Sequence, residues 1–341
     1  MKKGFSDFIK DQYTKLPPVA TADLTGKTVV VVGANTGLGF EATKHFARMN
    51  PGKLILACRS EERGSAAVKK LKSETSYDKA ELWIVDLGKF SSVVAFTDRF
   101  EKSGERLDIL VANAAMGPYE YKTTSDGWEE SLQVNALSLS LMSLLLAPRM
   151  VETGVKYATK PRIVIVSSDL HYMIGTNLED VYEAKSPFRL LNSPEHCTQK
   201  LLSSGDRYSE TKLLNVFFAQ SLAELLKDTP VIVNSLNPGY CYSELRRSFS
   251  GVKAMVDYLM EKVLAHTTEA GSRSLVYAAV GGADDPEKLR GAYLNINTPT
   301  EPADAVIGEE GRKRQDKLWA DLIAELSKVD RRIPSIIKQL S

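Results

Sequence analysis

Residues 28–46, TVVVVGANTGLGFEATKHF, decide the fold. The stretch begins with a continuous apolar, β-branched run, which is typical of a strand covered on both faces, and it continues as a helical pattern. Three glycines join the two elements: Gly33, Gly37 and Gly39. Glycine lets the backbone turn sharply there, and it lets a pyrophosphate approach the amides of the helix N-terminus. The spacing G-x-x-x-G-x-G differs from the better-known G-x-G-x-x-G, but its position between a strand and a helix predicts a nucleotide site.

The same alternation of strand and helix patterns continues along the chain. Further strand patterns occupy residues 53–58, 81–86, 107–112, 162–168, 231–236 and 292–297, and helix patterns occupy 38–50, 60–74, 90–103, 126–152 and 206–227. Buried-type strands that alternate with helices indicate right-handed βαβ crossovers and a parallel sheet between two helix layers. We therefore predict a single α/β domain of Rossmann type, doubly wound, with a mostly seven-stranded parallel sheet and helices on both faces.

Three segments fall outside this alternation. We assign residues 1–23 to an N-terminal extension and 24–298 to the Rossmann-type domain, which carries an insertion at about 169–205. Residues 299–341 form a C-terminal helical extension. Apolar residues recur at helical spacing in the N-terminal extension, so we expect a short helix docked on its own domain, with contact to a membrane or a partner as the alternative.

Composition argues against several classes of protein. The 341 residues are 43% hydrophobic and 26% charged with a net charge of +1, which gives no reason to expect nucleic acid as a partner. Three distant cysteines without a CxxC pair fit a reducing compartment, and four histidines without ligand spacing predict no metal site.

The N-terminus lacks the apolar run of a secretory signal. The longest apolar run, residues 137–147, is shorter than the ~20 residues of a membrane span. We expect a cytoplasmic protein without an integral membrane segment.

The end of the second strand predicts which nucleotide binds. In ACRSEER, residues 57–63, Arg59 stands where an acidic residue would bind both ribose hydroxyls of NAD. A guanidinium suits the 2′-phosphate of NADP instead, and an exposed surface arginine is the alternative. Asp86, at the end of the third strand, is placed to meet the adenine ring.

Tyr208 and Lys212 stand four residues apart in SGDRYSETKLLNVFF, residues 204–218, so their side chains share one helix face. A phenol with its ordinary pKa of about 10 is a poor acid–base catalyst near neutrality. A neighbouring ammonium and a positively charged nicotinamide favour the phenolate, and they would bring the pKa of Tyr208 toward the working pH. The pattern predicts a proton-transfer pair at the start of a helix that is anchored in the core.

Three further polar residues accompany this pair. Ser168 ends the fifth strand, at the sheet edge where doubly wound folds bind ligands. Asn113 follows the fourth strand. Asn135 interrupts the apolar helix pattern SLQVNALSLSLM, residues 131–142, where a polar side chain indicates a specific role.

Seven motifs in order connect these observations with a known family. They are GANTGLG (33–39), DL (86–87), ANAA (112–115), Asn135, VSS (166–168), YSETK (208–212) and NPG (237–239). On these motifs the chain resembles the short-chain dehydrogenase/reductase family over about residues 24–298, and within it the retinol-dehydrogenase-like branch that includes many fungal enzymes.

The resemblance implies a role for each catalytic position. Tyr208 transfers the proton, Ser168 polarises the carbonyl, and Lys212 holds the nicotinamide ribose and lowers the pKa of Tyr208. Asn135 binds a water that links Lys212 to solvent, while Ser167 is a structural hydroxyl. The residues implied to bind NADP(H) are Gly33, Asn35, Thr36, Gly37, Leu38, Gly39, Arg59, Asp86, Leu87, Asn113, Ala114, Ala115, Tyr208, Lys212, Pro238, Gly239 and Ser243. The chain departs from the family pattern at Val32, Ala115 and Ser243 without losing a catalytic group.

The substrate is expected among the residues after the fifth strand, the insertion and the stretch from Tyr240 to about Val263. Named substrate contacts are His171, Tyr172, Tyr240 and Tyr242; further apolar members are Met173, Ile174, Leu245, Phe249, Met255 and Tyr258. These side chains predict a lipophilic or aromatic carbonyl compound. We predict an NADP(H)-dependent oxidoreductase that interconverts a carbonyl and an alcohol, in the reductive direction. The alternatives are a retinol or isoprenoid alcohol dehydrogenase and a catalytically inactive NADP-sensing regulator. A homodimer is common in the family, but the C-terminal extension could cover its usual interface.

Overall fold

The computed structural model describes residues 3–117, 120–174, 178–202, 206–243, 245 and 251–341. Their centre is one sheet with the strand order β3-β2-β1-β4-β5-β6-β7-β8. Seven strands are parallel: β1 (Thr28–Val32), β2 (Lys53–Cys58), β3 (Ala80–Ile84), β4 (Ile109–Ala112), β5 (Arg162–Val166), β6 (Ile232–Asn237) and β7 (Tyr293–Asn295). The predicted doubly wound α/β fold with seven parallel strands is confirmed.

The register of the sheet brings the ends of the central strands to one edge. Val32 of β1 pairs with Ala57 of β2 and with Ala112 of β4, and Ala112 pairs in turn with Ile165 of β5. The residues that directly follow these strands therefore lie together at the carboxyl edge of the sheet, where folds of this type bind ligands.

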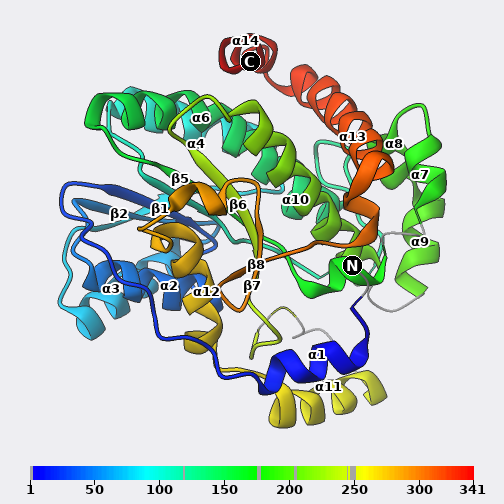
Figure 1. Ribbon diagram of the computed structural model, residues 1–341, viewed down its shortest axis with the longest axis horizontal. Helices are drawn as coiled ribbons and strands as arrows, with labels where there is room; N and C mark the ends of the chain where they lie inside the picture. The colour runs from blue at the N-terminus through cyan, green and yellow to red at the C-terminus, as the bar shows by residue number, and fades with distance from the viewer. Residues whose placement is uncertain (1–2, 118–119, 175–177, 203–205, 244, 246–250) are drawn as a thin grey trace.

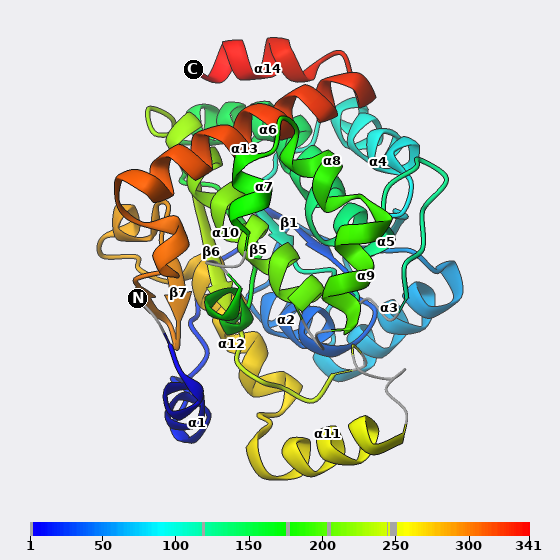
Figure 2. The ribbon, with the colours of Figure 1, turned by 90° about the vertical axis from the view of Figure 1, so that its right-hand side faces the viewer.

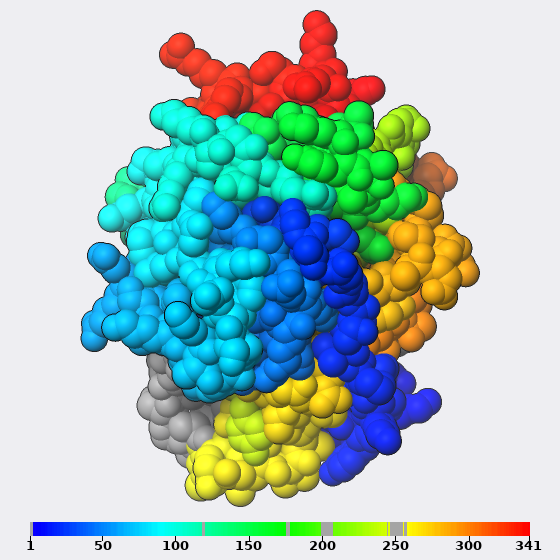
Figure 3. Space-filling view, turned by 90° about the vertical axis from the view of Figure 1, so that its left-hand side faces the viewer, coloured from blue at the N-terminus to red at the C-terminus, as the bar shows by residue number. Residues whose placement is uncertain are grey.

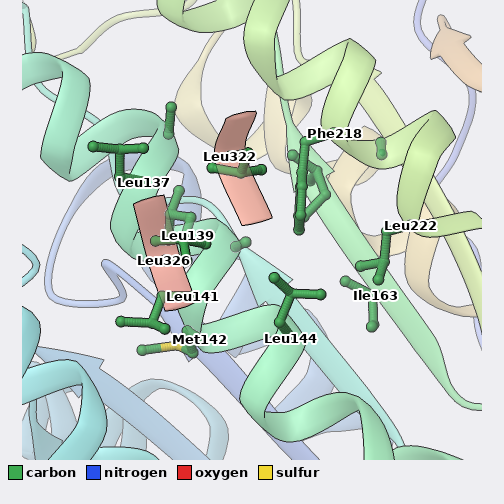
Figure 4. Close-up of a cluster of buried hydrophobic side chains, with 14 of the residues drawn as sticks. Leu137, Leu139, Leu141, Met142, Leu144, Ile163, Phe218, Leu222, Leu322 and Leu326 are labelled. Atoms are coloured by element: carbon green, nitrogen blue, oxygen red, sulfur yellow. The ribbon is translucent and has the colours of Figure 1, made fainter. Parts of the chain in front are cut away.

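Helices cover both faces of the sheet (Figure 1). One layer consists of α2 (Gly37–Arg48), α3 (Glu61–Thr75) and α12 (Thr268–Val280), and the other of α4 (Phe90–Ser103), α6 (Ser138–Tyr157) and α10 (Asp206–Leu225). Under the second layer lies a core of leucines from α6, with Ile163 of β5 and Phe218 of α10 (Figure 4). Leu322 and Leu326 extend this core into the C-terminal helix α13 (Gly308–Val329).

The sheet has an eighth strand that the sequence pattern does not reveal. β8 (Thr298–Thr300) pairs antiparallel with β7 across Ile296 and Asn297, which both have positive φ, 50° and 60°. A two-residue turn with φ > 0 at both positions is the normal β-hairpin connection, but it usually announces itself by Asn-Gly or Asp-Gly. A proline in β8 also masks the strand, and it is tolerated because β8 lies at the edge of the sheet.

The helix predicted at 126–152 is displaced and interrupted. It starts with α5 (Glu130–Leu132), passes through a π-helical turn η1 (Gln133–Leu137), and continues as α6 to Tyr157. It begins at Glu130 because the carboxylate of Glu129 accepts hydrogen bonds from the amides of Ser131 and Leu132. Within the described residues, the helix Glu130–Tyr157 is long and apolar enough to cross a membrane, but 78% of its most apolar window is buried inside the fold. The prediction that its apolar run forms a buried helix is confirmed.

The remaining elements lie around this framework, at opposite ends of it and along one side (Figure 2). Between β5 and α10 lie η2 (Asp169–Met173), α7 (Glu179–Glu183), α8 (Pro187–Leu191) and α9 (Pro194–Leu202); after β6 come α11 (Gly251–Leu264), η4 (Pro286–Leu289), η5 (Asp304–Val306) and α14 (Ile333–Leu340). The carboxylate of Asp321 in α13 accepts hydrogen bonds from the Ser186 hydroxyl and the Phe188 amide. Helix α13 thus holds the insertion in place.

The N-terminal helix α1 (Phe5–Tyr13) docks on the body of the protein, as predicted. Figure 3 shows the N-terminal segment, in dark blue, running along one side of the molecule to the yellow segment that contains α11. Gln12 and Asp11 on α1 make the polar contacts of this docking, with the loop after β6 and with β7.

Candidate active site

The glycine loop passes close to the chain that follows β4. Gly33 has a φ of +78°, and a Cβ on it would lie 2.8 Å from the Cα of Ala114. A Cβ on Gly39 would lie 2.3 Å from the carbonyl oxygen of Gly33. The amide of Asn113 donates to the carbonyls of Val32 and Gly33, at 3.3 and 3.1 Å, so it braces the end of β1. These positions require glycine because the two backbones nearly touch.

The start of α2 is open on its outer side. Gly37 has a φ of +59°, a Cβ on it would meet no atom within 4 Å, and the first turn of α2 contains no acidic residue. Asn35, Thr36 and Leu38 are half-buried around this opening. A helix N-terminus of this kind presents free amides and a positive dipole end, which fits a phosphate group.

Further residues predicted to bind the cofactor follow β2, β3 and β4 at the same sheet edge. Arg59 directly follows β2 and is exposed, and no ion pair of its guanidinium is found among the described residues. Asp86 is half-buried, and its carboxylate accepts a hydrogen bond from the Gly88 amide at 3.0 Å. Leu87 is buried, and its carbonyl accepts a bond from the Ser138 hydroxyl. Ala114 and Ala115 are half-buried after β4.

Lys212 is buried against the end of β5. Its ammonium donates to the carbonyl of Val166 at 2.8 Å, and the Ser167 hydroxyl donates to the carbonyl of Lys212 at 2.7 Å. Asn215, one turn further along α10, also donates to the Val166 carbonyl, at 3.4 Å. These bonds fix α10 against β5, which ends two residues before Ser168, and they engage the Ser167 hydroxyl in the fold.

Tyr208 and Ser168 remain accessible next to this buried lysine. The Lys212 ammonium lies 5.3 Å from the centre of the Tyr208 ring, and Tyr208 is half-buried whereas its neighbours Arg207 and Ser209 are buried. The Ser168 hydroxyl accepts a hydrogen bond from the Leu170 amide at 3.2 Å, so its own hydrogen is free to be donated to a ligand. The structure thus brings the predicted tyrosine and lysine together on α10, and it anchors this helix beside the serine.

Asn135 lies in the π-helical turn and braces two segments. Its side-chain amide donates to the carbonyl of Met116 at 2.9 Å and to the hydroxyl of Thr211 at 3.1 Å, and its oxygen accepts from the Met116 amide at 2.8 Å. Both N–H groups are therefore occupied by protein. The predicted water would have to bind the second lone pair of this oxygen or the backbone carbonyl.

Lys212 also makes the stability of the protein depend on pH. Burial lowers its pKa from 10.5 to about 7, so between these values the unfolded chain binds a proton that the folded protein does not. As pH rises from 7 toward 10, we expect the free energy of unfolding of the cofactor-free wild type to rise relative to that of Lys212→Met, by about 1.4 kcal/mol per pH unit. Urea unfolding of both proteins at several pH values measures this difference. The control Lys69→Met, at an exposed site on α3, should keep a constant difference from wild type, and a constant difference for Lys212→Met would refute the prediction.

The prediction that His171 contacts substrate is wrong. His171 is fully buried, its Nδ1 lies 2.7 Å from the carbonyl of Ser168, and its Nε2 accepts from the Ala303 amide at 3.2 Å. Burial lowers the pKa of His171 to about 4, so it is neutral and links the serine turn to the C-terminal segment. Tyr172 is also engaged elsewhere, because its hydroxyl donates to the carbonyl of Glu301 at 2.6 Å.

The loop after β6 carries the remaining predicted positions. Pro238 is buried, Gly239 has a φ of +79°, and the exposed Ser243 accepts a hydrogen bond from the Leu245 amide. The Tyr240 ring packs edge-on against Phe8 of α1, with centroids 6.1 Å apart. Tyr242 stays a candidate. Of the apolar candidates, Ile174 is buried, Leu245 is half-buried, Met173, Met255 and Tyr258 are exposed, and Phe249 lies outside the described residues.

A buried charged cluster that was not predicted from the sequence lies next to Tyr208. Arg207 donates to Glu129 at 2.7 Å and to Glu210 at 2.9 Å, and Glu210 contacts Nε2 of His196 at 2.8 Å. All four residues are at most 6% exposed. The available signal in the sequence was two opposite charges, three residues apart, just before the apolar run LLNVFFA, residues 213–219.

Comparison with known proteins identifies the family. A model of the short chain dehydrogenases matches residues 27–184. A short chain dehydrogenase/reductase of Cryptosporiopsis sp. is 34% identical over 326 residues, which cover 94% of this chain and 97% of the relative. This chain belongs to the short-chain dehydrogenase family. A short-chain dehydrogenase/reductase of Phaeosphaeria nodorum is 33% identical to this short-chain dehydrogenase, over 96% of the chain and 94% of the relative.

Solved structures share the fold of this short-chain dehydrogenase. L-sorbose reductase of Gluconobacter frateurii, solved with NADPH and L-sorbose, aligns with a TM-score of 0.57 at 19% identity, over 80% of this chain and 96% of its own. An uncharacterized protein of Mycobacterium paratuberculosis aligns with a TM-score of 0.62 at 24% identity, over 92% of this chain and 97% of its own. The family membership makes the chain an oxidoreductase.

Proposed function

We propose that this short-chain dehydrogenase is an NADP(H)-dependent enzyme that interconverts a ketone or aldehyde and the corresponding alcohol, on a lipophilic or aromatic small molecule. The observation that carries the proposal is the position of the Lys212 ammonium, buried beside the accessible Tyr208 ring and bonded to the end of β5 just before Ser168. This position supports a site in which a proton donor, a hydrogen-bond donor and a cation act together at the carboxyl edge of a dinucleotide-type sheet.

The residues of the glycine loop fit the cofactor. The empty space at Gly37 and the open N-terminus of α2 suit a pyrophosphate, because free amides and the helix dipole favour negative charge. Arg59, exposed and without an ion-pair partner among the described residues, suits the 2′-phosphate that distinguishes NADP from NAD. Relatives of similar fold, among them L-sorbose reductase solved with NADPH, support the same choice.

The chain's own residues supply the proton chemistry. When bound, the reduced nicotinamide supplies the hydride to the carbonyl carbon. The Tyr208 phenol donates its proton to the carbonyl oxygen, while the free hydrogen of the Ser168 hydroxyl bonds the same oxygen and stabilises its developing negative charge. When Lys212 is protonated, its charge favours the phenolate that Tyr208 leaves, and its remaining N–H groups are available to the ribose of the cofactor.

The direction and location are part of the proposal. The three cysteines are free and buried, which fits a reducing compartment, and NADPH favours reduction there. Exposed apolar side chains on α11, among them Met255, Tyr258 and Leu259, support a lipophilic substrate that approaches over this helix. We therefore propose a cytoplasmic carbonyl reductase.

A spectrophotometric screen tests the proposal. Purified protein is mixed with NADPH and a panel of aromatic and aliphatic ketones and aldehydes, and NADPH loss is followed by its near-ultraviolet absorbance. We expect turnover of at least one bulky lipophilic carbonyl, with slower turnover of small polar ones. Binding of NADPH without turnover of any member would favour the NADP-sensing alternative.

The cofactor preference depends on Arg59. Replacing Arg59 by Asp removes the cation that would face the 2′-phosphate and adds a repelling charge. We therefore expect the binding free energy that favours NADPH over NADH to fall by about 1–3 kcal/mol, as for a hydrogen bond to a charged group. Titration of each variant with both nucleotides measures the ratio of the two affinities. Lys72→Asp, an equal charge change at the exposed far end of α3, is the control and should leave the ratio unchanged. An unchanged ratio in Arg59→Asp would assign the arginine to the surface alone.

A further inference from the structure

The N-terminal helix α1 lies against the loop that follows β6. Gln12 is only 7% exposed although it belongs to a short helix at the edge of the molecule. Its side-chain amide donates to the carbonyls of Tyr240 and Leu264, at 2.9 and 2.8 Å, and its oxygen accepts from the amide of Tyr240 at 2.9 Å. One side chain therefore pairs with both backbone groups of Tyr240, as a neighbouring strand would.

The fit between helix and loop is close. A Cβ on Gly239 would lie 3.3 Å from the Gln12 oxygen, and the cavity left between α1 and the loop has a volume of about 10 Å³. The Phe8 ring of α1 also packs edge-on against the Tyr240 ring. Gly239 in this loop has a φ of +79°. The loop is held in this conformation by residues of α1, more than 200 positions earlier in the chain.

A second chain of hydrogen bonds leads from α1 to the serine turn. The Asp11 carboxylate accepts from the Asn295 amide at 2.8 Å, and the Asn295 oxygen accepts from the Asn237 amide at 3.1 Å. The Asn237 oxygen accepts from the backbone amides of Asp169, at 3.2 Å, and of Gly239, at 3.1 Å. Asn237 thus ties the residue after Ser168 to the loop after β6.

Lys3 completes this connection. Its ammonium lies 2.6 Å from the Asp11 carboxylate and 3.8 Å from that of Asp169, whose other oxygen accepts from the Tyr293 hydroxyl. Burial raises the pKa of Asp169, and the nearby Lys3 ammonium opposes this rise. The N-terminal segment therefore contacts both loops that border the reacting groups, yet it lies outside the Rossmann-type alternation of strands and helices.

We propose that α1 contributes to the active site and that Gln12 is a positioning residue for the cofactor. This inference rests on the proposed function and on the family resemblance, which assigns Pro238 and Gly239 to the NADP(H) site. Gln12 holds the loop at Tyr240 in the conformation that receives the nicotinamide half of NADP(H). Without Gln12, the cofactor has to order the loop when it binds, and the cost of this ordering reduces the binding free energy. Cofactor affinity therefore falls while the fold persists.

Two measurements on Gln12→Met test the proposal, because methionine keeps the bulk and loses all three hydrogen bonds. Without cofactor, we expect amide hydrogen exchange in residues 237–243 to be about 10-fold faster than in wild type, as the loss of local hydrogen bonds implies. We expect NADPH affinity, from fluorescence titration, to weaken by about 5- to 30-fold, with a smaller change of kcat at saturating NADPH. Tyr13→Ser, at the neighbouring 68% exposed position of α1, is the control and should match wild type in both.

Each other outcome overturns the proposal. Unchanged exchange would mean that Gln12 does not hold the loop. Faster exchange with unchanged NADPH affinity would mean that the held conformation does not serve the cofactor. If wild-type protein bound neither NADPH nor NADH, the proposed function itself would fail, and the exchange measurement would still decide whether α1 orders the loop. A melting curve of each variant confirms that the fold is retained. If Gln12→Met does not fold, both measurements are made on Gln12→Ala, which leaves the backbone partners free to bind water.

Discussion

Tyr208→Phe is expected to lose nearly all carbonyl reduction while it still binds NADPH. The substitution removes one oxygen and leaves the ring, which lies 5.3 Å from the Lys212 ammonium and is half-buried. In the proposed mechanism that oxygen carries the proton for the carbonyl, and a positioned general acid contributes typically about 10²–10⁴-fold to the rate. Steady-state turnover with NADPH and a substrate from the screen measures the loss.

The control for this prediction is another tyrosine on the same molecule. Tyr157 ends α6 and is 43% exposed, so Tyr157→Phe should leave the rate unchanged. NADPH affinity of Tyr208→Phe should stay within a few-fold of wild type, because Lys212 keeps its bond to the Val166 carbonyl. If Tyr208→Phe retained most of its turnover, another group would have to deliver the proton and the assignment of the catalytic pair would be wrong.

The parts of the fold that sequence reasoning finds are those encoded locally. A buried parallel strand such as β1 is a run of β-branched residues, and the glycines after it are needed within the same few residues, so both appear as one pattern. The same holds for Tyr208 and Lys212, whose spacing of four places them on one helix face. The structure adds that Lys212 is anchored on Val166, a contact that strand and helix patterns do not specify.

The parts that it misses depend on partners distant in the chain. Gln12 is an ordinary polar residue until Tyr240, 228 positions later, is placed beside it. His171 follows Ser168 so closely that it suggests a ligand contact, but the short helix η2 turns its ring inward to the Ala303 amide. The residues next to Gln12 and His171 in the sequence do not predict these partners, because tertiary packing decides which polar groups are buried.

The buried charges around Arg207 carry the second large prediction. The guanidinium holds Glu129 and Glu210 together, and all three side chains are at most 2% exposed. Burial alone would raise the pKa of Glu129, yet the Arg207 charge and the bonds from Ser131 hold it below its ordinary value, so the carboxylate stays ionised. Removing the arginine would leave two buried carboxylates near each other without a compensating charge.

We therefore expect Arg207→Met to lower the free energy of unfolding by about 3–5 kcal/mol, the loss measured when one member of a buried ion pair is removed. Urea unfolding followed by fluorescence measures it. Arg312→Ala is the matched control, since Arg312 is 53% exposed and pairs with Asp316 on the surface of α13, and it should cost less than about 1 kcal/mol.

A double variant separates lost charge from lost packing. Arg207→Met combined with Glu210→Gln removes one of the two uncompensated carboxylates and keeps an amide beside His196, whose ring nitrogen lies 2.8 Å from Glu210. If charge dominates, the double variant should be more stable than Arg207→Met alone, because neighbouring substitutions in one network are not additive. If the second substitution only adds to the loss, Arg207 contributes by filling space. Because Arg207 precedes Tyr208 on α10 and His196 belongs to α9, the cluster connects the insertion with the helix that carries Tyr208.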